Sequence, residues 1–382
     1  MRTSTLFGMV AAATIGAACN DPAPPAAPSA IPVSTGAPSS AVTATASATA
    51  TASAITSSAA VSSSPPPSVV ADPKVLPTID PLPPMNVPAS NAPTVEAIAL
   101  GKVLFFDKRL GKDGKFSCEG CHYEDKGWAD ATVLSTKADG SVNKRHTPTL
   151  FNVGYQTHWY WDGRAPSLEA QIVAAWKGQM GVAETLDERV KEVAKVAAYK
   201  AMFKAAFGSD EVSTERIVKA LASFVRTLRS GDAPFDKFEH GDKKAISESA
   251  ARGWEVFRKV GCASCHAPPL FTDLSFHAVG IGSTAPQPDL GRGAITKDEA
   301  DNGRFKTPTM RSVSTNAPYF HDGSAATLEE AVDYMLGGGP PGAKVDGAFK
   351  QAKLTKGERD DLLAFLRSLA ATPAKLERPR IP

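Results

Sequence analysis

The sequence carries almost no net charge. It holds 42 lysines and arginines against 40 aspartates and glutamates, a formal charge of +2 over 382 residues. Because no broad basic field exists, the composition argues against a nucleic-acid partner. After the first 19 residues, no stretch reaches the roughly 18 consecutive apolar residues that a membrane-spanning helix needs. We therefore expect no transmembrane helix beyond that point.

Cysteine is also scarce, with five residues, and Cys19 stands apart from the other four. Arg2 supplies positive charge, Leu6–Ile15 is apolar but too short to span a bilayer, and small residues precede Cys19. This order is typical of an export signal over residues 1–19, and its end resembles a bacterial lipoprotein signal with Gly16 in place of leucine. We expect a periplasmic protein that is lipid-anchored at Cys19, with ordinary cleavage nearby as the alternative.

Residues 20–92 contain few large side chains. Alanine, serine, threonine and proline dominate, and no charged or aromatic residue lies between Pro22 and Ala71. Such a segment buries too little apolar surface to offset its ordering entropy, so we expect a disordered tether. At roughly 5–6 Å times the square root of its length, a chain of about 70 residues reaches on the order of 45 Å.

The other four cysteines form two pairs, each followed directly by a histidine. The motifs are Cys118-Glu-Gly-Cys121-His122 and Cys262-Ala-Ser-Cys265-His266. C-x-x-C-H is the attachment pattern of c-type haem, in which two thiols form thioethers and the histidine faces the iron. A zinc site would bring four ligands together, whereas each cluster offers three and the clusters lie 144 residues apart (118 to 262). A redox dithiol would need a βαβ setting, which the sequence does not predict. We expect two covalently bound haem c groups.

Apolar residues at helical spacing dominate the folded part, and strand-like alternation is rare. We therefore expect an all-α fold of two cytochrome c-like haem domains, residues 93–238 and 239–382. Ser230–Lys244, rich in turn residues, is predicted to be the domain junction. The expected helices are Thr94–Phe106, Leu186–Phe207, Thr214–Arg229, Ser247–Val260, Thr327–Met335 and Thr355–Leu369.

Several segments between about Val95 and Leu369 carry a resemblance to a known family. They are Leu100–Leu110, the first haem motif, Arg145–Leu150, Trp161–Ala165, the second haem motif, Phe305–Arg311, Ala317–Gly323 and Thr327–Ala331. In this order they resemble the bacterial di-haem cytochrome c peroxidases, including the MauG-like branch. The resemblance implies an exported enzyme that reduces hydrogen peroxide to water at the first haem. Electrons from a small cytochrome c or cupredoxin would enter at the second.

The resemblance also implies the iron ligands. His122 would hold the first haem and His266 the second. Members carry a methionine or tyrosine fourteen residues after the histidine that corresponds to His321, and that position is Met335. A thioether ligand suits an electron-transfer haem, because it raises the reduction potential. Packing of Met335 in the core is the alternative.

Three further residues take roles from the resemblance. Trp161 matches a tryptophan between the haems and would carry electrons or a radical, or serve as a buried structural residue. Arg164 would pair with a haem propionate, since guanidinium suits carboxylates. His321 would lie near the haems.

Two positions depart from the family pattern on the peroxide side. Ala138 stands sixteen residues after His122, where classical members carry a distal histidine, so we expect the first haem to be open. Gln179, followed by Met180, best matches the family's acid–base glutamate. Glutamine can position peroxide by hydrogen bonds but carries a proton poorly. Glu184 is the nearest carboxylate that could replace it.

A third departure concerns calcium. Members hold calcium with an asparagine side chain and two backbone carbonyls, which here would come from Asn316 and Pro318. His146 replaces the asparagine, and imidazole is a poor ligand for a hard cation, so calcium binding stays open. We interpret His146 as a structural hydrogen-bonding residue at the interface, with substitution for the missing distal ligand as the alternative. The histidines expected to be structural or at the surface are His158, His240 and His277.

Two other functions stay open at this point. MauG-like oxidation of a protein or organic partner is favoured by the missing distal histidine. A tethered electron carrier without turnover is favoured by glutamine at position 179. Neither the motifs nor the composition decides whether the protein forms a homodimer, and the only membrane contact that we expect is the lipid anchor.

Overall fold

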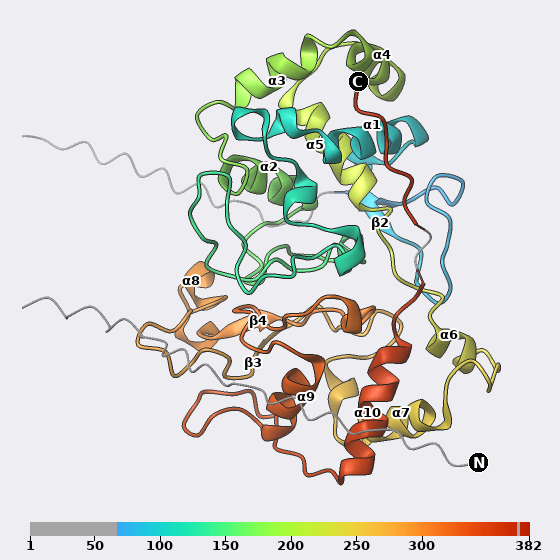
Figure 1. Ribbon diagram of the computed structural model, residues 1–382, viewed down its shortest axis with the longest axis vertical. Helices are drawn as coiled ribbons and strands as arrows, with labels where there is room; N and C mark the ends of the chain where they lie inside the picture. Colours follow the sequence, from blue (N-terminus) through green and yellow to red (C-terminus); the bar gives the residue numbers. More distant parts are fainter. Residues whose placement is uncertain (1–66, 373–374) are drawn as a thin grey trace, which may run out of the picture. The chain divides into compact units, whose positions relative to one another are not determined.

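The computed structural model describes residues 67–372 and 375–382 and is mostly helical (Figure 1). Residues 1–66, with the expected export signal, Cys19 and most of the expected tether, lie outside the described residues. Two antiparallel two-stranded sheets accompany the helices, a detail that the all-α prediction did not include. They pair β1 (Ser68–Val70) with β2 (Asn86–Pro88), and β3 (Phe276–Ala278) with β4 (Arg304–Lys306). In the described part, no helix combines the length and apolar character needed to cross a membrane.

The first hydrophobic core is formed by residues between Leu100 and Leu228. Its helices are α1 (Val95–Phe106), α2 (Leu168–Gly178), α3 (Leu186–Ala194), α4 (Ala197–Phe207) and α5 (Thr214–Val225). Helix α1 begins as predicted, because the Thr94 hydroxyl accepts a hydrogen bond from the Ala97 amide. Helices α1 and α5 touch at Gly101, where an added Cβ would lie 1.9 Å from the Ala220 carbonyl oxygen. Only glycine permits this close crossing.

The second core is formed by residues between Phe235 and Leu369. The helices that contribute to it are α6 (Pro234–Glu239), α7 (Glu248–Lys259), α9 (Leu328–Gly337) and α10 (Lys356–Ser368), and the short helix α8 (Gly293–Thr296) lies outside it. Helices α7 and α10 cross at Gly253, where an added Cβ would lie 1.9 Å from the Asp361 carbonyl oxygen. Thr355 and Glu358 form the reciprocal capping box of α10. The crossing at Gly253 corresponds to the crossing at Gly101 in the first core.

Short 3-10 turns connect these elements. They are η1 (Ala89–Asn91), η2 (Lys108–Leu110), η3 (Lys112–Gly114), η4 (Cys118–Gly120), η5 (Glu124–Lys126), η6 (Val153–Tyr155), η7 (Cys262–Ser264), η8 (Glu299–Asp301) and η9 (Val313–Thr315).

An internal repeat relates the stretch from His146 through α2 to the stretch from Lys306 through α9 at an offset of 160 positions, whereas the two haem motifs lie 144 positions apart. Thr147-Pro-Thr recurs as Thr307-Pro-Thr, and the Asp-Gly pair after Trp161 recurs after His321. The backbone repeats as well. The paired residues Trp159 and Ala165 recur as Tyr319 and Ala325, and the helix caps Ser167 and Thr327 are again 160 positions apart. Equivalent positions of the two halves can therefore be compared directly.

The predicted disordered tether is wrong for residues 67–92. This segment forms β1 and β2 and a small core of its own. Its buried members, Ala71, Leu76, Met85 and Val87, pack with the partly buried Ile98 and Tyr155. The reason is compositional, because large apolar residues return to the chain from about position 69 while the proline content stays high.

Two predicted boundaries also differ from the structure. The domain boundary at 238/239 is wrong, because α6 lies in the predicted junction and its Phe235 ring packs 5.0 Å from the Phe365 ring in the second core. The single helix Leu186–Phe207 is interrupted at Val196, which has an extended backbone. Residues six apart face different sides of a helix, so this break lets both Val193 and Tyr199 enter the core.

Candidate functional site

The first haem motif lies on the η4 turn and ends in a partly buried histidine. His122 Nδ1 lies 2.8 Å from the backbone carbonyl oxygen of Trp128. A carbonyl only accepts hydrogen bonds, so Nδ1 carries the proton and Nε2 keeps its lone pair. Burial lowers the pKa of His122, which keeps the imidazole neutral. This is the state in which imidazole binds a metal, with the carbonyl fixing the ring orientation.

The Trp128 carbonyl is itself held by the core. Trp128 has the left-handed backbone conformation, with φ of 59°, which a bulky residue rarely adopts. Its ring is 4% exposed and packs edge-on against Phe105 of α1 and Phe224 of α5. The packing of α1 and α5 thus fixes the acceptor that orients His122.

The second motif, on the η7 turn, repeats this arrangement. His266 is buried, and its Nδ1 lies 3.0 Å from the Phe271 carbonyl oxygen. Phe271 also has a positive φ, 52°, and its fully buried ring packs against Phe257 and Phe365. Burial lowers the pKa of His266 as well. Both halves therefore present a neutral histidine whose Nε2 is available to iron.

Burial disfavours ionisation of the four thiols of the motifs. All four are free of disulfides. Burial raises the pKa of Cys118 to about 12 and that of Cys262 to about 11. In each motif the two thiols and the histidine lie on and directly after one short 3-10 turn. The residues fit a c-type haem at each motif.

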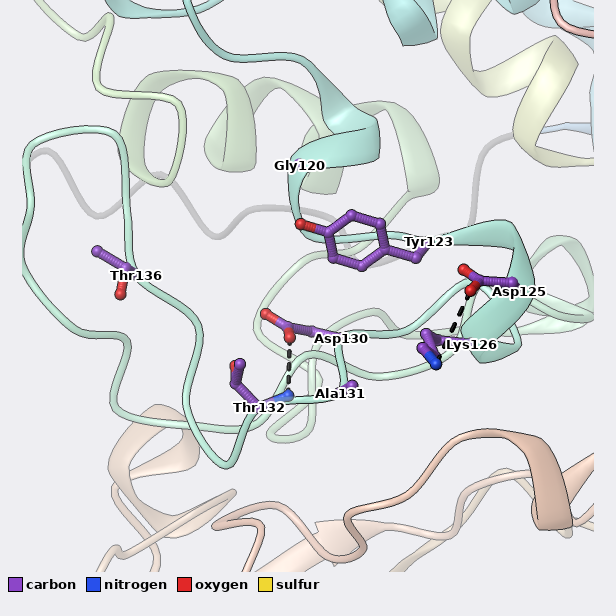
Figure 2. A pocket seen from close by; sticks show the side chains of 8 residues that line it. All are labelled: Gly120, Tyr123, Asp125, Lys126, Asp130, Ala131, Thr132 and Thr136. Carbon is purple, nitrogen blue, oxygen red and sulfur yellow. Dashed lines mark hydrogen bonds and ion pairs between the residues drawn. The ribbon is translucent and has the colours of Figure 1, made fainter.

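A cavity of about 400 Å³ opens beside the first motif (Figure 2). Gly120 and Tyr123 line it on the motif side, and the η5 turn contributes Asp125 and Lys126. The loop that follows provides the opposite wall with Asp130, Ala131, Thr132 and Thr136. The cavity therefore adjoins the place where the first haem would be attached.

Trp161 and His321, equivalent positions of the repeat, meet where the two halves touch. Their ring centroids are 6.4 Å apart, with the rings edge to face. The Trp161 carbonyl accepts a 2.8 Å hydrogen bond from the Lys306 amide, and the His321 carbonyl accepts a 2.7 Å bond from the His146 amide. Lys306 and His146 are also equivalent in the repeat. The contact thus has approximate twofold symmetry.

Charged side chains reinforce this contact. Arg145 forms a bidentate pair with Asp289 of the second half, at 2.7 and 2.8 Å, and a 2.6 Å bond to Asp162 of the first. Arg164 bonds the same Asp162 at 3.0 Å and lies 3.4 Å over the Tyr160 ring. Arg164 is thus engaged by a protein carboxylate, and its pairing with a haem propionate stays a prediction.

The comparisons with known proteins agree with this arrangement. Residues 95–244 match the family described as di-haem cytochrome c peroxidase. The methylamine utilization protein MauG of Methylophilus methylotrophus is 39% identical over 306 residues, covering 78% of this chain and 90% of that protein. The chain belongs to the di-haem cytochrome c peroxidase family. Membership implies covalently bound haem c and oxidoreductase chemistry.

Other members of the family carry different names. Cytochrome c551 peroxidase of Nitrosomonas europaea is 34% identical over 312 residues, covering 81% of this chain and 89% of that protein. The crystal structure of a MauG-like protein associated with microbial copper homeostasis matches with a TM-score of 0.70 and 30% identity, covering 78% of this chain and 95% of that one. Family membership is therefore compatible with both a peroxidase and a MauG-like enzyme.

The repeat distinguishes the two halves of this family member at the position opposite each histidine. Met335 lies on α9, eight residues after the cap Thr327, and is partly buried. Its neighbour Leu336 packs on the second core, whereas Met335 is not among the described residues of that core. The equivalent residue of the first half is Ala175 on α2, eight residues after Ser167. Alanine offers no ligand atom, so the first half has no counterpart of Met335.

The structure brings the two predicted peroxide-side positions together. The Ala138 amide donates a 2.9 Å hydrogen bond to the Gln179 carbonyl oxygen at the end of α2. The side-chain oxygen of Gln179, Oε1, is buried and has no hydrogen-bond partner among the described residues. A buried acceptor without a donor is costly, and it points to a group outside the protein chain. Glu184 is exposed, and its substitution for the acid–base glutamate stays a prediction.

His146 is buried and hydrogen-bonded. Its Nδ1 lies 3.0 Å from the Thr132 carbonyl oxygen, and burial lowers its pKa. These bonds agree with the structural interpretation of His146. Asn316 Oδ1 is buried without a hydrogen-bond partner in the described part, which fits a hard cation, whereas His146 offers no oxygen ligand.

The other histidines have distinct surroundings. His158 faces the Phe276 ring, and its carbonyl oxygen accepts a 2.7 Å bond from Lys306. His240 pairs with Asp80 at the surface, at 2.6 Å. The His277 ring nitrogens lie 2.8 Å from Asp273 and 2.7 Å from Asp346. Burial lowers the pKa of His277, but these two carboxylates raise it by more, so the pKa of His277 is higher than usual.

Sequence reasoning missed the two carbonyl acceptors and the repeat. The carbonyl of Trp128 or Phe271 leaves no trace in residue type, because any residue has one. The repeat had a visible signal, since Thr-Pro-Thr and Asp-Gly recur at the same offset of 160. That comparison would have identified Ala175 as the counterpart of Met335.

Proposed function

We propose that this protein is an exported di-haem c-type peroxidase that reduces hydrogen peroxide to water. The first half would be the peroxide site, and the second half would receive electrons from a small cytochrome c or cupredoxin. When bound, the haems supply the redox chemistry, in which one peroxide takes up two electrons and two protons and yields two waters. The relatives named cytochrome c peroxidase support this choice.

The observation that carries the proposal is the asymmetry between Met335 and Ala175. His266 and Met335 would hold the second iron from both sides, which suits electron transfer. His122 would hold the first iron from one side only, which leaves a position for peroxide. Ala138 removes the distal histidine that could otherwise fill this position.

Trp161 would serve as the route between the two halves. Its indole Nε1–H donates a 2.9 Å bond to the His146 carbonyl oxygen. A carbonyl does not take up the proton, so loss of one electron would leave the indole as a radical cation with its N–H intact. The edge-to-face contact with His321 holds the ring in place at the junction.

Gln179 would position peroxide. Its partly buried amide can accept a hydrogen bond at Oε1 from peroxide, but it cannot shuttle a proton between the two peroxide oxygens. We expect turnover to be limited by that proton transfer. Gln179→Glu would supply the missing acid–base group, with a gain on the order of 100-fold, the lower end of what a positioned acid–base residue contributes.

The test is steady-state peroxide turnover with a reduced cytochrome donor. The control is Gln171→Glu, because Gln171 lies on the same helix α2. A gain for Gln179→Glu but not for Gln171→Glu supports the role. Unchanged turnover in Gln179→Glu counts against placing residue 179 at the peroxide.

MauG-like oxidation of a protein or organic partner is the second candidate. Ala138, in place of the distal histidine, favours it, because the first haem would be open to peroxide. The relatives named MauG also favour it. Measuring peroxide consumption with and without a cytochrome donor separates the two, since a peroxidase depends on that donor.

We further propose a periplasmic location with a lipid anchor at Cys19, two haem groups and no nucleic-acid partner. The orphaned Asn316 oxygen supports a cation near the carbonyls of Asn316 and Pro318, and His146 opposes it. Elemental analysis of the purified protein decides whether calcium is bound. Sedimentation decides between a monomer and a homodimer.

A further inference from the structure

The last described residues of the chain return to the first haem motif. After α10, residues 375–382, which we call the strap, run beside α1 of the other half (Figure 1). Leu376 and Ile381 of the strap pack against the first hydrophobic core. The second half thus reaches back and covers part of the first.

Polar contacts fix the strap to both ends of the motif. Arg378 forms an ion pair with Glu119, inside the C-x-x-C-H motif, and lies 5.0 Å over the Phe106 ring. The Leu376 amide donates a 2.6 Å hydrogen bond to Glu124 Oε1, two residues after His122. The acidic residues around the motif raise the pKa of Arg378, with Glu119 as the largest cause.

The residues that the strap holds adjoin the residues that line the cavity. Glu119 precedes Gly120, and Glu124 begins the η5 turn that also contains Asp125 and Lys126. Gly120, Asp125 and Lys126 line the motif side of the 400 Å³ cavity (Figure 2). Movement of the strap would therefore change that wall directly.

We propose that the strap braces the motif side of this cavity and thereby limits the rate at which small ligands reach the first haem. Glu119 and Arg378 are positioning residues, since neither lies where peroxide would react. The inference rests on the proposed function only in taking the first haem as the open one. Arg378 is 57% exposed in its pair with Glu119, whose side chain is 22% exposed, so the brace can release and rebind.

The test uses the oxidised holoprotein and cyanide as the probe of the open haem. Arg378→Glu breaks the ion pair, and the rate of cyanide association should rise roughly 2- to 5-fold, the shift that an exposed ion pair produces. Combining it with Glu119→Arg restores the pair in reverse and should return the rate toward that of the unaltered protein. Arg380→Glu is the control, because Arg380 is an exposed arginine of the same strap. Deletion of residues 375–382 should give the largest increase.

Amide hydrogen exchange provides a readout that does not depend on haem ligation. Exchange in residues 119–126 should rise in Arg378→Glu and recover in the double variant. Equal cyanide rates and equal exchange in Arg378→Glu and Arg380→Glu would overturn the brace. If the unaltered protein binds no cyanide, the open first haem is wrong and the rate claim falls with it, whereas the exchange result still tests the strap.

Discussion

Replacing Arg311 by alanine removes one partner of a fully buried ion pair beside the second haem motif. Arg311 is 0% exposed and Asp236 is 4% exposed. Their two hydrogen bonds are 2.5 and 2.9 Å long, and Arg311 Nε also donates to the Pro269 carbonyl oxygen at 2.7 Å. The guanidinium lies 5.2 Å over the Phe271 ring. Arg311 therefore links α6 to the loop whose Phe271 carbonyl orients His266.

The expected loss follows from this burial. Removing one partner of a buried pair leaves an uncompensated carboxylate and costs about 3–5 kcal/mol of unfolding free energy. Arg252→Ala is the matched control, because Arg252 also binds an aspartate, Asp361, by two hydrogen bonds but is 61% exposed. An exposed pair of this kind contributes only about 0.2–1 kcal/mol. The two variants should therefore differ several-fold in their effect.

Denaturant unfolding of the holoprotein, followed by the far-ultraviolet signal and by the haem absorbance, measures both losses. Arg311→Ala should also perturb the spectrum of the second haem, because its histidine loses a fixed acceptor. Combining Arg311→Met with Asp236→Leu should recover much of the stability, since no buried charge remains. Equal losses for Arg311→Ala and Arg252→Ala would refute the reasoning.

Three further predictions concern single side chains. Met335→Leu should convert the second haem from low to high spin and lower its reduction potential. Met310→Leu, at a methionine that packs on the second core, should leave the spin state unchanged. Magnetic circular dichroism distinguishes the two spin states, and an unchanged low-spin signal in Met335→Leu would exclude Met335 as a ligand. Burial lowers the pKa of Lys306 from 10.5 to about 7. Between pH 7 and 10.5 the unfolded chain binds more protons at Lys306 than the folded protein does. The free energy of unfolding should therefore rise with pH by at most about 1.4 kcal/mol per pH unit, and Lys306→Met should flatten that rise. Denaturation measured at several pH values tests this, and equal slopes in the variant and the unaltered protein would contradict it. Trp161→Phe should slow electron transfer between the haems in rapid-mixing experiments. Trp159→Phe, two positions earlier in the chain, is the control, and equal transfer rates in the two variants would exclude Trp161 as the route.

Features encoded by neighbouring residues could be predicted from the sequence. The two C-x-x-C-H motifs predict the haem sites, since both thiols and the histidine lie within five residues. The helix starts at Thr94 and Thr355 follow from hydroxyl side chains that cap the next turn. The family resemblance, carried by motifs in order, is confirmed.

Features that depend on tertiary packing could not be predicted in this way. The positive φ of Trp128 arises because its ring fills a gap between two helices, and no local pattern signals it. The interruption at Val196 depends on the packing of both Val193 and Tyr199 in the first core. The ion pair between Glu119 and Arg378 joins residues more than 250 positions apart, and neither residue is distinctive in the sequence.

The central claim is that one haem is open and the other is closed by Met335. Electron paramagnetic resonance of the oxidised protein tests it most directly, before and after addition of one equivalent of hydrogen peroxide. The account predicts one high-spin and one low-spin haem in equal amounts at rest, with peroxide removing the high-spin signal first. Two low-spin haems at rest would contradict it.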